Sequence, residues 1–173
     1  MPAFLVTGNP GSGKSALAHE LGRRGVRAID PDDDPELAYA QDASGHRAER
    51  PQSPDEQWLR SHRWVWSRSR LAEVLATYDE PVFVCGIARN QHELLDLFDR
   101  VFLLRIDGPT QEARLVAHDA LHPPGRSEAG RQEIRAGRPV FEAQMLRHGA
   151  IALDGTAPTT LVADELLALV TAT

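Results

Sequence analysis

Short apolar runs alternate with longer segments of helical periodicity along the chain. Five runs are rich in Val, Leu, Ile and Phe, are bounded by turn residues, and predict strands over 3–7, 26–30, 81–85, 101–106 and 149–153. These runs are nearly continuously apolar, which is typical of strands that are covered on both faces. Helical spacing predicts helices over 14–24, 56–77, 91–98, 110–121, 127–147 and 159–171. The alternation of the two kinds of segment predicts an α/β fold with a parallel sheet.

Two segments interrupt this alternation. Residues 31–57 contain four prolines and few large apolar groups, and residues 119–138 contain a Pro-Pro-Gly break and several arginines. One interpretation is surface loop or local disorder. The other is a pair of mobile lids over an active site, because long excursions from a compact domain are often functional. On the second interpretation, 31–57 is an acceptor-side excursion and 115–138 is a lid.

Length and composition limit the class of protein. A chain of 173 residues with 42% hydrophobic residues is long enough for one domain with a core, so 1–173 is expected to be a single domain. The net charge of −6 argues against a basic surface for nucleic acid. One cysteine, Cys85, excludes an internal disulfide, and no apolar stretch approaches the roughly 18 residues of a membrane span. With no signal-peptide pattern at its start, we expect a cytoplasmic monomer or homodimer without membrane or nucleic-acid partners.

The sequence GNPGSGKS, at positions 8–15, carries the clearest chemistry. It fits G-x-x-x-x-G-K-[ST], and it lies between a predicted strand and a predicted helix, as a phosphate-binding loop requires. Backbone N–H groups and a helix N-terminus there would bind the phosphates of ATP, and Ser15 would place a hydroxyl on Mg²⁺. The predicted ATP contacts are Gly8, Asn9, Pro10, Gly11, Ser12, Gly13, Lys14, Ser15 and Ala16.

Lys14 is the only lysine in the chain, whose other fixed positive charges are all arginines. A compact ammonium on a flexible stem suits a narrow backbone loop better than a planar guanidinium does, which supports the motif. The absence of a second lysine also excludes the N-K-x-D guanine motif of Ras-type GTPases. Large motor ATPases need domains for which the chain has no room.

From this loop onward, the sequence resembles the shikimate kinase and adenylate kinase group of small P-loop kinases. The resemblance implies a P-loop NTPase fold with a five-stranded parallel sheet of order 2-3-1-4-5, flanked by helices. Ile29-Asp30-Pro31-Asp32 is similar to the D-x-D that follows the second strand of shikimate kinases. The resemblance makes Asp32 the group that orients or deprotonates the acceptor hydroxyl, and Asp30 a metal-side carboxylate near the substrate. The alternative is an Asp-Pro turn with solvated carboxylates, and the choice among Asp30, Asp32 and Asp33 stays open.

Other arginines take roles from the same resemblance. Arg63, in the predicted helix 56–77 among Trp58, Trp64 and Trp66, is a candidate acceptor contact, although tryptophans at helical spacing favour a core role. Arg89 follows the third predicted strand, where related kinases use an arginine on the acceptor. That strand ends in Cys85, where nucleotide monophosphate kinases have an aspartate.

The lid and the last loop complete the resemblance. Lid arginines close over the transferring phosphoryl group in these kinases, which makes Arg114 and Arg126 catalytic candidates. Gly137-Arg138-Pro139 is similar to the R-x-P-L-Y run of shikimate kinases, so Arg138 is a candidate substrate contact. Gly155 and Thr156 lie in a segment that resembles the loop beside adenine.

We therefore expect ATP-dependent phosphoryl transfer, with Mg²⁺, to a hydroxyl of a nucleoside, a nucleotide or a shikimate-like metabolite. The replacement of an aspartate by Cys85 motivates an alternative, an ATP-binding regulatory or pseudo-kinase module without efficient transfer. A kinase acting on nucleic-acid ends would need a basic channel, which the net acidity disfavours.

Overall fold

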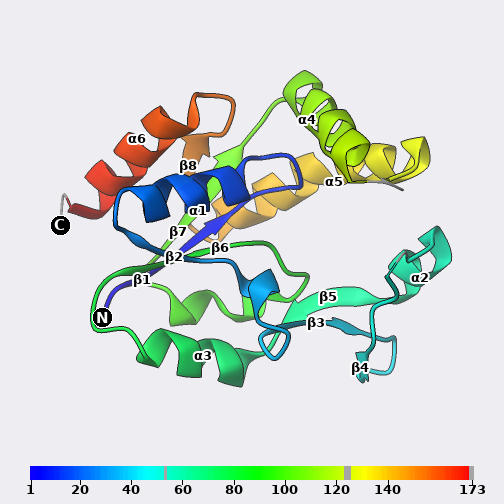
Figure 1. The fold of residues 1–173 in the computed structure, drawn as a ribbon, viewed down its shortest axis with the longest axis horizontal. Coiled ribbons are helices and arrows are strands. Elements are labelled where there is room, and N and C mark those ends of the chain that lie inside the picture. Colours follow the sequence, from blue (N-terminus) through cyan, green and yellow to red (C-terminus); the bar gives the residue numbers. More distant parts are fainter. Residues whose placement is uncertain (53, 123–125, 172–173) are drawn as a thin grey trace.

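A five-stranded parallel sheet forms the centre of the computed structural model, which describes residues 1–52, 54–122 and 126–171 (Figure 1). Its strands run in the order β2-β6-β1-β7-β8. Their bounds are Arg27–Ile29 for β2, Val82–Cys85 for β6, Ala3–Thr7 for β1, Arg100–Arg105 for β7 and Ile151–Asp154 for β8. The five predicted strands and their order are therefore confirmed.

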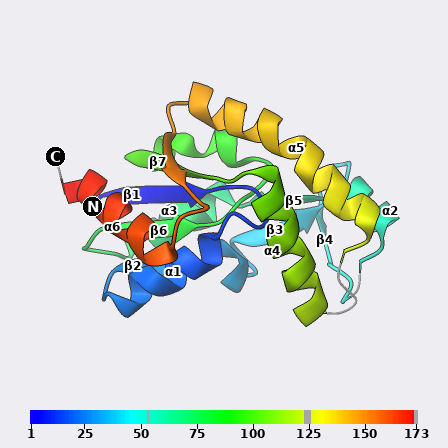
Figure 2. The same ribbon diagram turned by 90° about the horizontal axis from the view of Figure 1, so that it is seen from above.

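Helices cover both faces of this sheet because successive side chains of each strand point to opposite faces. Phe4 and Val6 of β1 pack with α1 (Lys14–Arg23) and α6 (Thr159–Thr171). Ala3 and Leu5 pack instead with α3 (Arg68–Ala76) and α5 (Glu128–Arg147). Figure 1 shows α1 and α6 together on one side, with α3 on the other, and Figure 2 shows α5 across β1 from α1. In folds of this kind, ligands bind at the carboxyl ends of the parallel strands.

A second sheet forms within and just after the predicted acceptor-side excursion. It is antiparallel, with the order β4-β3-β5, and comprises β3 (Ala38–Gln41), β4 (Arg47–Ala48) and β5 (Arg63–Trp66). The predicted helix over 56–77 is wrong, because β5 separates α2 (Glu56–Ser61) from α3. Trp64-Val65-Trp66 favours a strand, since aromatic and β-branched side chains fit a pleated surface. Arg63 consequently lies in a strand and not in a helix.

Three short segments adopt 3-10 turns. Pro31–Asp33 forms one such turn after β2, and Asp30 caps it by accepting a hydrogen bond from the Asp32 backbone N–H. The predicted helix over 91–98 is wrong, because two separate 3-10 turns, Gln91–Glu93 and Leu95–Leu97, occupy it.

The predicted lid is largely helical. It spans the end of α4 (Gly108–Leu121) and the first half of α5, and its Pro-Pro-Gly break, at 123–125, lies outside the described residues. Ion pairs join α4 to α5 and to the segment just before α5. Asp119 of α4 contacts Arg126 of that segment and Arg131 of α5, and Glu112 contacts Arg135. The mobility of this lid stays a prediction.

The two excursions touch each other at their outer ends. Arg60 of α2 forms an ion pair with Glu133 of α5, with 2.9 Å between nitrogen and oxygen, and the Ser127 hydroxyl donates to Glu56. The end of the acceptor-side excursion and the residues just after it therefore contact the start of α5 in the predicted lid. Within the part of the chain that the structure describes, no helix is long and apolar enough to cross a membrane.

Candidate active site

The phosphate loop connects β1 to α1 at the centre of the carboxyl edge. Gly13 adopts a left-handed conformation with a φ of +100° and caps α1 without a side-chain hydrogen bond. Gly8 has no room for a side chain, since a Cβ there would lie 2.4 Å from Ser12 Oγ and 2.9 Å from the Leu104 carbonyl oxygen. These glycines let the main chain turn tightly and leave the first N–H groups of α1 free for a ligand.

Two buried polar atoms in this loop have no hydrogen-bond partner within the structure. They are the side-chain amide nitrogen of Asn9, Nδ2, and the side-chain hydroxyl of Ser12. A buried donor without a partner costs free energy, so such atoms in a native protein call for an explanation. A bound anion that accepts hydrogen bonds from the loop would supply it.

Lys14 begins α1 and folds back over the loop. Its Nζ donates to the carbonyl oxygens of Gly8, at 2.6 Å, and Asn9, at 3.1 Å. Burial lowers the pKa of Lys14 to about 8, against the opposing charges of Asp30 and Asp32. The ammonium is thus poorly solvated in the ligand-free protein, where the charges of Asp30 and Asp32 offset only part of the effect of burial, and a phosphate would add a further anionic partner.

Asp30 and Asp32 follow β2, and the negative charges of both act on the Lys14 ammonium. Burial raises the pKa of Asp30, and the charges of Asp32 and Asp33 add to this effect, while Lys14 opposes it. One oxygen of Asp32, Oδ1, accepts a hydrogen bond of 2.7 Å from the indole nitrogen of Trp64. The structure therefore brings together the lysine and the two carboxylates that the sequence singles out, and it adds Trp64 as an orienting donor.

Cys85 ends β6 within the electrostatic reach of Asp30 and Lys14. Burial and the charge of Asp30 raise the pKa of its thiol to about 12. A neutral, buried thiol is neither a nucleophile nor a good metal ligand. Near Lys14, the carboxylate is therefore supplied by Asp30, directly after β2, whereas β6 ends in the Cys85 thiol.

Arg114 of α4 joins the phosphate loop to the loop after β8. Its guanidinium donates to the carbonyl oxygens of Gly11, at 3.1 Å, and Gly155, at 2.8 Å. Gly155 is in turn packed against the phosphate loop, because a Cβ at this position would lie 3.0 Å from the Ser12 carbonyl oxygen. The base-side loop predicted from the sequence thus adjoins the phosphate loop, and Arg114 holds the two at a fixed separation.

Gln111 is a site residue that the sequence analysis missed. It is fully buried, donates to the Pro10 carbonyl oxygen at 3.0 Å, and accepts a hydrogen bond from Arg138 at 3.2 Å. Its position one helical turn before Arg114 is the one sequence signal that would have pointed to it, since both then face the phosphate loop.

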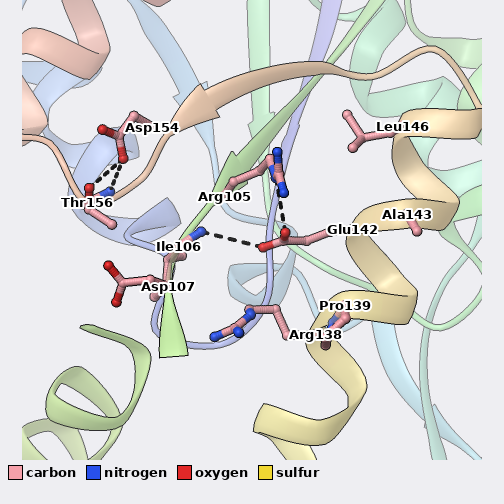
Figure 3. Close-up of a pocket in the computed structure, with 10 residues that line it drawn as sticks. All are labelled: Arg105, Ile106, Asp107, Arg138, Pro139, Glu142, Ala143, Leu146, Asp154 and Thr156. Atoms are coloured by element: carbon pink, nitrogen blue, oxygen red, sulfur yellow. Dashed lines mark hydrogen bonds and ion pairs between the residues drawn. The ribbon is translucent and has the colours of Figure 1, made fainter. Parts of the chain in front are cut away.

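Arg138 also lines a cavity of about 600 Å³ between α5 and the carboxyl ends of β7 and β8 (Figure 3). Thr156 and Asp154 line the same cavity, whose wall includes a pair formed by Arg105 and the buried Glu142, with 3.1 Å between Arg105 Nε and Glu142 Oε2. The structure therefore places Arg138 and Thr156 in the wall of one cavity, and the predicted role of Arg138 as a substrate contact stays a prediction.

The remaining predicted arginines, Arg63, Arg89 and Arg126, each contact a different residue. Arg63 bonds Gln41 on the face of the small sheet opposite Trp64, because neighbouring residues of a strand alternate in direction. Arg89 follows β6, and its backbone N–H donates to the Trp64 carbonyl oxygen at 2.8 Å. Arg126 pairs with Asp119 inside the helical lid. Their roles stay predictions.

The comparisons with known proteins support the fold. No protein-family model and no curated protein sequence matches the chain. Among solved structures, shikimate kinase from Acinetobacter baumannii, in complex with shikimate, aligns with a TM-score of 0.62 and 17% identity over 99% of this chain and 94% of that one.

Two further structures align with TM-scores above 0.5. Deoxyadenosine kinase from M. mycoides with bound dATP has a TM-score of 0.56 and 11% identity, over 98% of this chain and 99% of that one. A gluconokinase from Sinorhizobium meliloti 1021 has a TM-score of 0.54 and 20% identity, over 96% and 90%. The chain therefore has the fold of the small P-loop kinases, the fold shared by shikimate kinase, deoxyadenosine kinase and gluconokinase.

Proposed function

We propose that this protein transfers the γ-phosphoryl group of ATP to a hydroxyl of a small molecule. The observation that carries the proposal is the meeting of Lys14, Asp30 and Asp32 at a glycine loop that has unpaired buried donors. An ammonium beside such a loop binds phosphate, and a carboxylate beside both is placed to act on an acceptor. The kinases that share the fold support this interpretation.

The nucleotide half of the site uses main-chain donors. The N–H groups at the start of α1, together with Ser12 and Asn9, would hold the phosphates, and Lys14 would exchange the Gly8 and Asn9 carbonyl oxygens for phosphate oxygens. Arg114 fixes the width between the phosphate loop and the base-side loop of Gly155 and Thr156. In this arrangement Arg114 supports the bound nucleotide, which extends its predicted role at the transferring group.

Mg²⁺ fits the donor set at this site. The described residues contain no group of three or more His, Cys, Asp or Glu side chains that would enclose a metal by itself. Mg²⁺ in kinases is held instead by one or two protein oxygens and the phosphates, and Ser15 and Asp30 offer such oxygens. When bound, the ion would neutralise charge on the phosphates during transfer.

Asp32 is the group that would orient the acceptor hydroxyl. Trp64 occupies its Oδ1, and its Oδ2 has no hydrogen bond to any described residue. A carboxylate held by one oxygen presents the other in a fixed direction, and a hydroxyl that donates to it has its oxygen lone pairs free for the phosphorus. Catalysis would then rest on positioning and on the charges around the phosphoryl group, including Lys14.

A second function, nucleotide binding without efficient transfer, is favoured by one observation. The thiol of Cys85 is neutral and buried at the end of β6, so no second carboxylate joins Asp30 from that strand. A metal shell with one carboxylate fewer would bind ATP and transfer its phosphoryl group slowly. This candidate predicts tight ATP binding together with background turnover.

The test measures ADP production with Mg²⁺ and a panel of hydroxylated acceptors that includes shikimate, gluconate and deoxyadenosine. The proposal predicts that at least one acceptor raises turnover well above the acceptor-free rate. Lys14→Ala should abolish this increase, by about 100-fold or more, while circular dichroism shows an intact fold. If ATP binds tightly and no acceptor raises turnover, the kinase proposal fails and the second function takes its place.

A further inference from the structure

Residues 86–91, directly after β6, join the main sheet to the small sheet. The first N–H of this stretch, that of Gly86, donates to the Val6 carbonyl oxygen of β1 at 3.1 Å. The buried ring of Trp66, at the end of β5, packs against the same glycine, where a Cβ would lie 2.7 Å from the ring. The stretch ends in two adjacent side-chain amides that no predicted role includes.

Asn90 carries the first amide, which binds the main chain of β5. Its Oδ1 accepts a hydrogen bond of 2.9 Å from the Trp66 N–H, and its Nδ2 donates one of 2.9 Å to the Trp66 carbonyl oxygen. The side chain thus binds β5 as the main chain of a neighbouring strand would. The Arg89 N–H adds a hydrogen bond of 2.8 Å to the Trp64 carbonyl oxygen. Trp64 in turn holds Asp32 through its indole N–H.

Gln91 carries the second amide, which binds the strand that leads into the phosphate loop. Its buried Oε1 accepts two hydrogen bonds, one of 3.1 Å from the Thr7 hydroxyl and one of 3.2 Å from the Ala88 N–H. Thr7 is the last residue of β1 and directly precedes Gly8 of the loop. The Nε2 of Gln91 lies 3.2 Å from the sulfur of Met145, in α5. One buried amide therefore connects the start of the phosphate loop to the loop after β6 and to α5.

The two amides are consecutive in sequence, so they act on one short stretch of main chain. Through Asn90, this stretch holds β5 and with it the indole that orients Asp32. Through Gln91, it holds the end of β1, from which the phosphate loop and Lys14 follow. The hydrogen bonds of two neighbouring residues thus constrain the distance from Asp32 to the phosphates. A misplacement of about 1 Å between reacting groups can slow a reaction by about 100-fold.

We infer that Asn90 and Gln91 are positioning residues, whose amides align the acceptor side of the site with the phosphate loop. They act through the groups that they bind, Trp66 on one side and Thr7 on the other. This inference rests on the proposed function and adds to it the residues that keep its two halves in line for transfer. Weakening either amide should therefore slow transfer without weakening the binding of ATP or of the acceptor.

Thr7→Val and Thr7→Ser form a matched pair that tests the Gln91 contact. Valine has nearly the shape of threonine but no hydroxyl, so Gln91 Oε1 loses one of its two donors, whereas serine keeps that donor. In the ADP-production assay with the best acceptor, Thr7→Val should lower kcat by about 10-fold and leave both KM values within about 2-fold of the wild type. Thr7→Ser should keep a kcat close to that of the wild type. Equal kcat values for the two variants would overturn the inference.

Gln91→Leu and Asn90→Ala remove the amides themselves. Each should lower kcat by about 100-fold and also change where the phosphoryl group goes. With [γ-³²P]ATP, these variants should release a larger share of the label as inorganic phosphate than the wild type does, because ATP stays bound while the acceptor hydroxyl is out of line.

Leu166→Ala, in the core on the other face of the main sheet from Met145, is the control for lost stability. A merely structural role of the amides would lower the melting temperature, as this control does, and leave the division of label between acceptor and phosphate unchanged. An unchanged division in both amide variants would count against the inference.

Hydrogen exchange tests the alignment without an acceptor. AMP-PNP and Mg²⁺ fill the phosphate loop, and the exchange of amide hydrogens in 63–66 and 86–91 is followed by mass spectrometry. Because Gln91 connects these segments to the loop, the nucleotide should slow their exchange by about 10-fold in the wild type and much less in Thr7→Val. This result without any phosphorylated acceptor would support the alignment and refute the proposed function alone. Exchange that the nucleotide leaves unchanged in the wild type, or slows equally in Thr7→Val, refutes the inference.

Discussion

The buried ammonium of Lys14 should make the ligand-free protein less stable than a variant without it. Lowering the lysine pKa from 10.5 to about 8 corresponds to about 3 kcal/mol of preference for the neutral amine. Lys14→Met keeps the length of the side chain, removes the charge, and loses two hydrogen bonds to the Gly8 and Asn9 carbonyl oxygens, which costs about 1–2 kcal/mol. The variant should therefore be about 1–2 kcal/mol more stable at pH 7 and melt roughly 2–8 °C higher.

The free energy of unfolding should also change with pH in a direction that can be measured. Between pH 8 and 10.5 the unfolded chain holds a proton on Lys14 that the folded protein has lost, so the free energy of unfolding of the wild type rises with pH there. Below pH 8 both states are protonated and the full penalty remains. The advantage of Lys14→Met should thus be largest at and below pH 7 and shrink toward pH 10.

Thermal unfolding followed by circular dichroism from pH 6 to pH 10 measures this difference directly. Added ATP and Mg²⁺ should raise the melting temperature of the wild type and not that of Lys14→Met, because only the wild type holds the phosphates tightly. A ligand-free variant that melts below the wild type at pH 7, or a difference that grows with pH, would refute the reasoning about burial.

Three further substitutions or modifications probe other parts of the site. Gly86→Ala places a Cβ 2.7 Å from the Trp66 ring and should destabilise the protein by about 1–3 kcal/mol in urea unfolding; an unchanged midpoint would contradict the packing described. Arg114→Gln should raise KM for ATP by about 10- to 100-fold and leave acceptor KM unchanged, and the reverse pattern would move Arg114 to the acceptor side. Cys85 should resist alkylation by iodoacetamide at mildly alkaline pH in the folded protein and react fully in guanidinium chloride, whereas rapid labelling of the folded state would contradict its burial and its pKa of about 12.

The main sheet and the phosphate loop were predictable because their signals are local. Each strand of the main sheet is a short apolar run, and the glycines and Lys14 of the loop occupy fixed positions in one short segment. The order of the strands follows from the resemblance to small P-loop kinases, and the pairing of β1 with β6 and β7 confirms it. Asp30 and Asp32 could be placed for the same reason, since they directly follow a strand.

The small sheet could not be predicted because its pairing is not local. β3 and β5 are more than 20 residues apart, β4 is two residues long, and β5 lies between two helices in a segment with helical spacing. The contacts that depend on this sheet, from Trp64 to Asp32 and from Arg50 to Trp64, were missed for the same reason. Trp66 illustrates the ambiguity, because a buried tryptophan in a strand and one in a core helix look alike in sequence.

The partners of the lid arginines were equally hidden. Nothing in the sequence indicates a partner for Arg126, yet its guanidinium donates a hydrogen bond of 2.6 Å to Oδ1 of Asp119 in the preceding helix. The ion pair between Arg60 and Glu133 joins two segments that are distant in sequence, and no pattern of residues in the sequence predicts it. Such pairings depend on how α4 and α5 cross, which tertiary packing decides and residue spacing does not.

The transfer of labelled phosphate from [γ-³²P]ATP tests the central claim most directly. Wild-type protein, incubated with Mg²⁺ and the best acceptor of the panel, should produce a labelled acceptor in an amount equal to the ADP formed. Asp32→Asn should still bind ATP and should lose this product by about 100-fold or more, because the acceptor hydroxyl is no longer oriented by a carboxylate. Label released only as inorganic phosphate, or full transfer by Asp32→Asn, would contradict the account.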